Sequence, residues 1–184
     1  VCRLRSEHPE RPALLLTGHL DVVPAGDEER WTHPPFAGRL ADGYLWGRGA
    51  LDMKNFVAMA ALVLKLLARR EVVLERDVIL AAVADEEASC DHGSRFLVEQ
   101  HPDLVTAEFA IGESGGWPAL AGDRAFVPVQ TAEKGVVWLK ATARGEAGHG
   151  SMPILGSAVE RLADALLTLQ RRRLPQHVTP VVEH

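Results

Sequence analysis

Acidic residues and one histidine stand directly after three short apolar runs of the chain. The apolar runs span residues 14–17, 78–83 and 109–111. The motifs that follow them are Gly-His-Leu-Asp at 18–21, Asp-Glu-Glu at 85–87 and Gly-Glu at 112–113. Short apolar runs of this kind predict buried parallel strands, and ligands gather outside the carboxyl ends of such strands. We therefore expect a histidine and several carboxylates to meet at one edge of a sheet.

Carboxylates gathered in this way require a cation. The acids concerned are Asp21, Asp52, Glu86, Glu87 and Glu113. Two unit charges about 4 Å apart repel by roughly 4 kcal/mol at an effective dielectric of 20, and several such pairs would exceed a domain's net stability of about 5–15 kcal/mol. Two Zn²⁺ ions would neutralise three ligand carboxylates and a hydroxide. A paired-metal site also fits hydrolysis, because one ion acidifies water and the other polarises a carbonyl.

The spacing of these residues suggests separate roles. On a strand, His19 and Asp21 point to the same face, so Asp21 can orient the imidazole ring as a neighbour of the metal ligand. Asp52 stands at the expected N-cap of a helix and has two oxygens with which to bridge two ions. Glu86 and Glu87 point in opposite directions on extended backbone, so one can bind metal while the other acts as a general base.

The elements that must hold these side chains alternate between strand and helix. We expect strands at residues 1–5, 13–17, 44–46, 78–84 and 109–111, and helices at residues 55–70 and 91–100. A long connection rich in proline, glycine and aspartate covers residues 24–42. The helix at 55–70 is apolar on nearly every side, which predicts cover on both of its faces. This order predicts an α/β fold with a mostly parallel sheet and helices on both faces.

The pattern changes near residue 132, where we place a domain boundary. Residues 1–132 form the N-terminal part of one domain, and residues 133–184 begin a second one. Apolar and polar residues alternate over 137–144, which predicts a half-buried strand, and a helical apolar stripe runs from Val159 to Leu169. One strand and one helix cannot bury their faces alone. Between them, glycines flank His149, a placement that suits a donor to an oxyanion.

Composition narrows the class of protein. The 184 residues carry a net charge of −5, which gives no basic field for nucleic acid or for an anionic membrane. No apolar stretch approaches about 18 residues, so we expect no membrane span. Cys2 and Cys90 make no disulfide framework and favour a reducing compartment, so we expect a cytoplasmic protein.

Five motifs together resemble a known family, the zinc-dependent amidohydrolases and peptidases that include acetylornithine deacetylase, succinyl-diaminopimelate desuccinylase, aminoacylase and related carboxypeptidases. The motifs occur in the family's order, at residues 18–24, 47–54, 85–87, 112–113 and 148–153. The resemblance implies a zinc-peptidase-like catalytic domain followed by a ferredoxin-like α+β lid and dimerisation domain. It also implies a homodimer formed through that lid.

The resemblance assigns the metal ligands. It implies that His19, Asp52 and Glu113 bind one zinc ion, that Asp52 bridges, and that Glu87 serves a second zinc ion. Two Zn²⁺ would occupy each complete active site, with Co²⁺ or Mn²⁺ as alternatives. The family's last ligand is a histidine far downstream, for which His177 and His184 are poor substitutes. We therefore expect the sequence to be part of a longer enzyme.

The resemblance also assigns the catalytic groups and the reaction. Glu86 would be the general base, Asp21 the support for His19, and His149 a lid histidine that reaches the partner subunit's active site. The implied activity is hydrolysis of the amide bond of N-acyl amino acids or small peptides by metal-bound hydroxide. We expect the 184-residue segment alone to lack full activity.

Two other functions remain compatible with these residues. One is a truncated or degenerate relative that binds metal, or dimerises, without turnover. The other is a structural metal or calcium module built from Asp52 and the paired glutamates. The imidazole of His19 favours zinc over calcium, because calcium prefers oxygen ligands.

Overall fold

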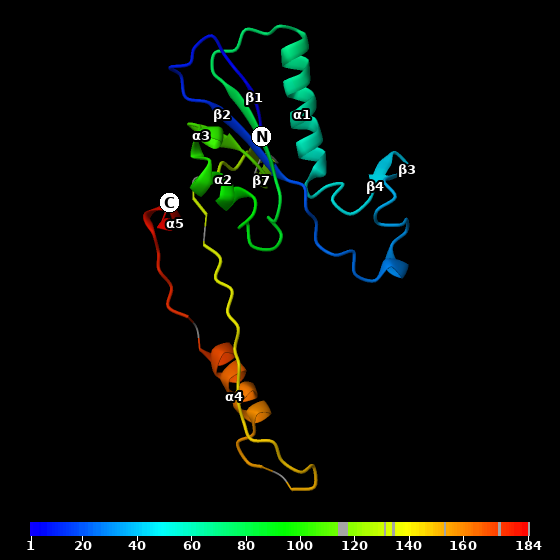
Figure 1. The fold of residues 1–184 in the computed structure, drawn as a ribbon, viewed down its shortest axis with the longest axis vertical. Helices are drawn as coiled ribbons and strands as arrows, with labels where there is room; N and C mark the ends of the chain where they lie inside the picture. Colours follow the sequence, from blue (N-terminus) through cyan, green and yellow to red (C-terminus); the bar gives the residue numbers. More distant parts are fainter. Residues whose placement is uncertain (114–117, 131, 134, 153, 173, 184) are drawn as a thin grey trace. The chain divides into compact units, whose positions relative to one another are not determined.

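Within residues 1–113, four strands form one sheet in the order β1 (Cys2–Leu4), β5 (Val78–Val83), β2 (Leu14–His19) and β6 (Phe109–Ile111). Helix α1 (Lys54–Arg69) lies beside this sheet (Figure 1). The central strand β2 is parallel to both β5 and β6. The edge strand β1 is antiparallel to β5. The sheet is therefore mainly parallel, as expected for an α/β fold.

The computed structural model describes residues 1–113, 118–130, 132–133, 135–152, 154–172 and 174–183. It separates into two units, Val1–Pro128 and Val129–His184, which we describe one at a time. Among the described residues, no helix has the length and apolarity that crossing a membrane would need. The domain boundary that we expect after residue 132 stays a prediction.

The register of the parallel strands brings the expected motifs to one edge. His19, the last residue of β2, stands opposite Val83 at the end of β5. On the other side of β2, Leu16 stands opposite Ile111 at the end of β6. The residues that follow these strands therefore leave the sheet at its carboxyl edge, where His19 lies.

Aliphatic side chains of the sheet and of helix α1 (Lys54–Arg69) form the core of the first unit. Ile79 of β5 is fully buried, and Leu16 and Leu80 pack in a cluster with Ala60 and Leu64 of α1. Burying one such aliphatic side chain contributes about 1.5–3 kcal/mol. The core therefore fixes α1 against β2 and β5.

Gly18 of β2 lets α1 approach the sheet closely. Side-chain atoms of Met53 and Val57 lie 3.0 Å from the position that a Cβ of residue 18 would take. The opposite face of α1 is less covered than we expect from its sequence, since Met59 and Leu62 are exposed. In the described residues of the first unit, one face of α1 is buried rather than two.

The long connection after β2 contains elements that its composition did not reveal. It holds the 3₁₀ turn η1 (Glu28–Arg30) and strand β3 (Arg39–Ala41), which pairs with β4 (Tyr44–Trp46).

A second hairpin, far from this connection in the sequence, joins β7 (Ala119–Ala121) to β8 (Arg124–Phe126).

The predicted helix at 91–100 begins later and is followed by another turn. Helix α2 spans Ser94–Gln100, and α3 spans Pro102–Val105. Gly93 lies against the end of β5, where a Cβ would come within 1.9 Å of the Ala84 carbonyl oxygen. Residues 91–93 are therefore held in the turn after β5 and do not join the helix.

In the second unit, helix α4 (Ala158–Arg171) confirms the predicted helical stripe, and α5 (Pro180–Glu183) follows it. Ser157 and Glu160 form a reciprocal capping box at the start of α4. The predicted strand at 137–144 is wrong, because residues 135–149 contain no strand and Trp138 and Leu139 are exposed. A strand needs a partner for its ladder, and the described residues of this unit offer none. A ferredoxin-like lid is not shown.

Asp77, just before β5, ties the edge strand to the sheet. Its carboxylate accepts hydrogen bonds from the Ser6 N–H at 2.7 Å and from the Arg3 guanidinium at 3.3 Å. The Ser6 N–H, helped by the Arg3 guanidinium, outweighs burial and holds the pKa of Asp77 below its ordinary value. Asp77 is therefore a charged, nearly buried link between β1 and β5.

We expect Asp77→Asn to lower the free energy of unfolding by roughly 1–3 kcal/mol at neutral pH, because the buried partners lose a charged acceptor. A depressed folded-state pKa stabilises the protein above the ordinary carboxyl pKa. This contribution disappears as the pH falls through the folded-state pKa. Urea denaturation of the wild type and the variant across this range measures the difference. Asp123→Asn, at an exposed turn, serves as the control. Equal midpoints at neutral pH would contradict the assignment.

Candidate metal centre and active site

His19 is the centre of the candidate site. Its ring is buried, with 1% of the side chain exposed, and Nδ1 lies 2.9 Å from the main-chain carbonyl oxygen of Asp21. Since a carbonyl only accepts, Nδ1 carries a proton and donates it to this bond. In the neutral ring, Nε2 then presents a lone pair, which is the arrangement that a metal-binding imidazole needs.

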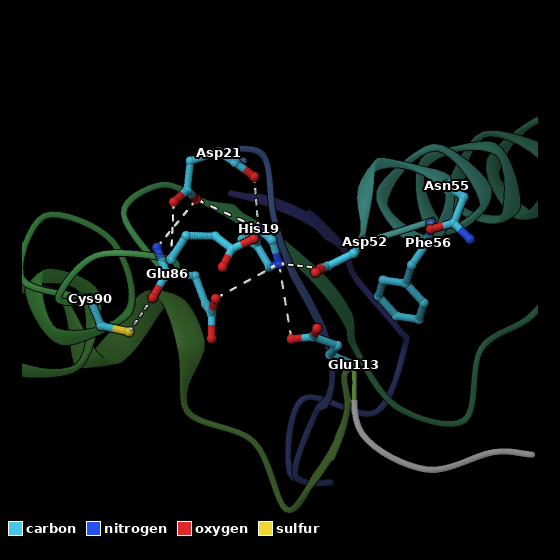
Figure 2. A network of polar contacts seen from close by, with 9 residues as sticks. His19, Asp21, Asp52, Asn55, Phe56, Glu86, Cys90 and Glu113 are labelled. Atoms are coloured by element: carbon cyan, nitrogen blue, oxygen red, sulfur yellow. Dashed lines mark hydrogen bonds and ion pairs between the residues drawn. The ribbon is translucent and has the colours of Figure 1, made fainter. Parts of the chain in front are cut away.

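Three carboxylates converge on His19 Nε2 (Figure 2). The nearest oxygens of Asp52, Glu86 and Glu113 lie 3.0, 3.8 and 4.0 Å from that nitrogen. All three acids are more than two-fifths exposed, whereas the imidazole is buried. The arrangement is a partly exposed cluster of negative charge around one buried nitrogen donor.

His19, Asp52 and Glu113 form a group that fits a divalent metal ion. One ligand atom from each residue lies within 4.8 Å of the ligand atoms of the other two. Among the described residues, this is the group of side chains that could hold a metal ion. One imidazole and two carboxylates are ordinary zinc ligands. A lone pair and a carboxylate oxygen 3.0 Å apart repel each other unless a proton or a cation lies between them. The residues present therefore fit a metal.

Protonation equilibria in the site reflect the same crowding. Burial lowers the pKa of His19, but hydrogen bonds to the Asp21 carbonyl and to Asp52, with the charge of Glu86, raise it above the ordinary value. For the carboxyl group of Glu113, burial raises the pKa, and the charges of Asp52 and Glu86 raise it further. Both shifts favour uptake of positive charge, which a metal ion would supply in place of protons.

Asp52 does not cap α1, contrary to our expectation. The N-cap is Met53, and no side chain caps the helix. Main-chain acceptors already serve the first turn, since Lys54 N–H bonds to the Gly49 carbonyl and Phe56 N–H bonds to the Met53 carbonyl, both at 3.0 Å. The carboxylate of Asp52 is therefore free to face His19.

Asp21 contacts His19 through its main chain and, at a longer distance, through its carboxylate. Its main-chain carbonyl accepts from the ring, while its carboxylate lies 3.6 Å from Nδ1. The two carboxylate oxygens instead accept from the main-chain N–H groups of Glu86 and Glu87, at 3.2 and 3.1 Å. Burial raises the pKa of Asp21, but these two N–H groups outweigh it and lower the pKa.

Glu86 and Glu87 lie on a turn rather than on extended backbone. Asp85 has a positive φ of 65°, and its carboxylate accepts from the Ser89 hydroxyl at 2.9 Å and from His92 N–H at 3.2 Å. Asp85 thus closes the turn on itself, and Glu86 is directed towards His19 (Figure 2). The turn settles which glutamate faces the imidazole, a choice that spacing alone left open.

The predicted roles of Glu87 and of the histidines in the second unit stay predictions. Glu87 is not part of the metal-ligating group found among the described residues. His149 belongs to the second unit, where its Nδ1 lies 2.8 Å from the Ser151 hydroxyl oxygen. His177 also belongs to the second unit, and His184 lies outside the described residues.

One feature of the first unit did not emerge from the sequence. A depression of about 450 Å³ is lined in part by Trp31, Trp46 and Arg48, and the Arg48 guanidinium lies 5.0 Å from the centre of the Trp31 ring. Trp31 in the long connection, with Trp46 and Arg48 shortly after it, was the available signal. Their stacking depends on how that connection folds, which spacing does not reveal.

Comparisons with known proteins match most of this chain. A model of the family described as peptidase family M20/M25/M40 matches residues 15–179. A succinyl-diaminopimelate desuccinylase of Paracoccus denitrificans is 36% identical over 142 residues, which are 74% of this chain and 35% of that protein. A probable carboxypeptidase S-like 2 of Dictyostelium discoideum is 33% identical over 166 residues, 85% of this chain and 31% of that protein.

A third relative is an N-fatty-acyl-amino acid synthase/hydrolase PM20D1 of Xenopus tropicalis. It is 36% identical over 176 residues, which are 92% of this chain and 34% of that protein. The chain therefore spans about a third of the length of these curated relatives. The described group of His19, Asp52 and Glu113 lies within the part of the chain that the family model matches.

We expect the chain to bind Zn²⁺ through His19, Asp52 and Glu113. His19→Ala removes the buried nitrogen donor and should weaken binding by at least about a hundredfold, more than the loss of a supporting residue would. Competition with a zinc-chelating dye measures the affinity. His8→Ala, which removes a partly exposed imidazole paired with Glu10, is the control. Unchanged zinc affinity in His19→Ala would exclude the site.

Proposed function

Because the chain belongs to peptidase family M20/M25/M40, we propose that it carries the metal-binding part of a hydrolase that cleaves amide bonds of N-acyl amino acids or small peptides. The relatives support a hydrolase, and two of them are named for acylated amino acids. The observation that carries the proposal is the convergence of Asp52, Glu86 and Glu113 on His19 Nε2.

In this proposal, His19, Asp52 and Glu113 would hold one ion, Glu87 would serve a second, and the two oxygens of Asp52 would be available to both. Zinc is the proposed metal, with cobalt or manganese as alternatives. When bound, the metal supplies Lewis acidity, which lowers the pKa of water and polarises an amide carbonyl. The support is chemical, because the hydrogen bond from Nδ1 to the Asp21 carbonyl leaves a lone pair on Nε2 of the neutral ring.

Glu86 is the proposed general base. Its carboxylate is 41% exposed and faces the site from the turn after β5, at 3.8 Å from His19 Nε2. A carboxylate beside the ligands, yet open to solvent, can take a proton from water and later give it to the leaving amine nitrogen. Neither step requires Glu86 to bind the metal.

His149 is the proposed oxyanion donor, supplied across a homodimer by a ferredoxin-like lid that includes residues 133–184. Its Nδ1 accepts from the Ser151 main-chain N–H at 3.3 Å and lies 2.8 Å from the Ser151 hydroxyl oxygen. A neutral ring held in this way carries its proton on Nε2 and can donate it.

The proposal places the protein in the cytoplasm, which free Cys2 and Cys90 favour.

We expect Glu86→Gln, in the whole protein, to keep zinc and to lose about a thousandfold or more in kcat on N-acyl amino acids, because glutamine cannot accept the proton. Zinc content and kcat are measured on the same preparation. Glu99→Gln provides a matched control, since Glu99 pairs with Arg95 on the exposed surface of α2. Turnover near that of the wild type in Glu86→Gln would rule out this mechanism.

A further inference from the structure

We propose that the Asp21 carboxylate is a positioning residue for Glu86, and that the main-chain carbonyl of Asp21 is what orients His19. The inference rests on the proposed role of Glu86 as general base. Asp21 would thus perform two tasks with different atoms. Its side chain would position the general base Glu86, and its main-chain carbonyl would orient the metal ligand His19.

The first support is the match between two acceptors and two donors. Asp21 Oδ1 accepts from Glu86 N–H at 3.2 Å, and Oδ2 accepts from Glu87 N–H at 3.1 Å. Each oxygen of the carboxylate is thus used by one main-chain donor of the turn (Figure 2). The residues are 65 and 66 positions apart in sequence, so these bonds connect separate parts of the chain.

The second support is what the turn would lack without Asp21. The carboxylate of Asp85 bonds to Ser89 and His92, which lie in the same loop. Those bonds define the shape of the turn but do not attach it to the segment after β2. The bonds from Asp21 make that attachment, and they hold the residue that presents Glu86 to His19.

The third support is the separation of the two functional atoms of Asp21. His19 Nδ1 lies 2.9 Å from the main-chain oxygen and 3.6 Å from Oδ1. Only the first distance is that of a hydrogen bond. Any amino acid at position 21 retains the main-chain carbonyl. The orientation of the His19 ring should therefore survive loss of the Asp21 carboxylate.

Two roles for the side chain therefore predict different results. If the carboxylate oriented the imidazole, its loss would weaken metal binding by about 10–100-fold, as for other partners of metal ligands. If it positions Glu86, its loss leaves zinc affinity nearly unchanged. The rate then falls, because displacement of a catalytic group by about 1 Å can cost about a hundredfold.

The experiment uses Asp21→Asn, which has nearly the shape of Asp but presents an amide NH₂ to one of the two N–H donors. We expect zinc affinity within about threefold of the wild type, and hydrogen exchange at the amides of Glu86 and Glu87 to become faster. In the whole protein, kcat should fall about 10–100-fold with little change in KM. Asp91→Asn, next to the same turn but paired with Arg95 on the surface, is the matched control.

A double-mutant cycle isolates the path of the effect. If Asp21 acts through Glu86, then Asp21→Asn should cost little further rate when it is added to Glu86→Gln. A tenfold or greater loss of zinc affinity, with amide exchange at 86 and 87 unchanged, would overturn the inference. Wild-type turnover in Glu86→Gln would instead refute the proposed function, and the exchange and zinc measurements would still decide the role of Asp21.

Discussion

Repulsion among carboxylates around one buried imidazole is the constraint on which the site depends. Asp52, Glu86 and Glu113 come from three separate segments, yet their oxygens lie within 4.0 Å of His19 Nε2. Ligand oxygens of Asp52 and Glu113 lie within 4.8 Å of each other, and like charges at such a distance repel by several kcal/mol in a partly buried site. The folded chain keeps them together because α1 and the strands β2, β5 and β6 are held by an aliphatic core and by parallel pairing. The protein thus uses stability from the core to hold a site that favours a cation.

The main chain performs much of the positioning. The Asp21 main-chain carbonyl orients the His19 ring. Main-chain carbonyls accept hydrogen bonds from the N–H groups at the start of α1, so Asp52 does not cap that helix. The main-chain N–H groups of Glu86 and Glu87 donate to the Asp21 carboxylate. Side chains with acid–base or ligand chemistry are thereby left free of structural bonds. This division explains how several charged groups can face one small volume while the backbone around them remains well hydrogen-bonded.

Much of the site could be predicted from sequence, since strand ends in a parallel sheet share an edge. Spacing placed His19, Glu86 and Glu113 there correctly. It could not predict the turn at Asp85, whose positive φ decides that Glu86 faces the imidazole. It also misassigned Asp52 as a helix cap, because the alternative acceptors come from the folded segment 49–53. The strand at 137–144 failed for another reason, since a pattern of alternation shows a tendency but does not provide a partner strand.

The central claim is that His19, Asp52 and Glu113 share one divalent ion. Crystals of the zinc-loaded protein, with anomalous diffraction recorded at the zinc edge, test it most directly. The account predicts a zinc peak about 2.0–2.1 Å from His19 Nε2 and about 2.0–2.2 Å from oxygens of Asp52 and Glu113, with Glu86 beside the ion but not bound to it. A zinc peak without His19 among its ligands, or ligated by Glu86 in place of Asp52 or Glu113, would contradict it.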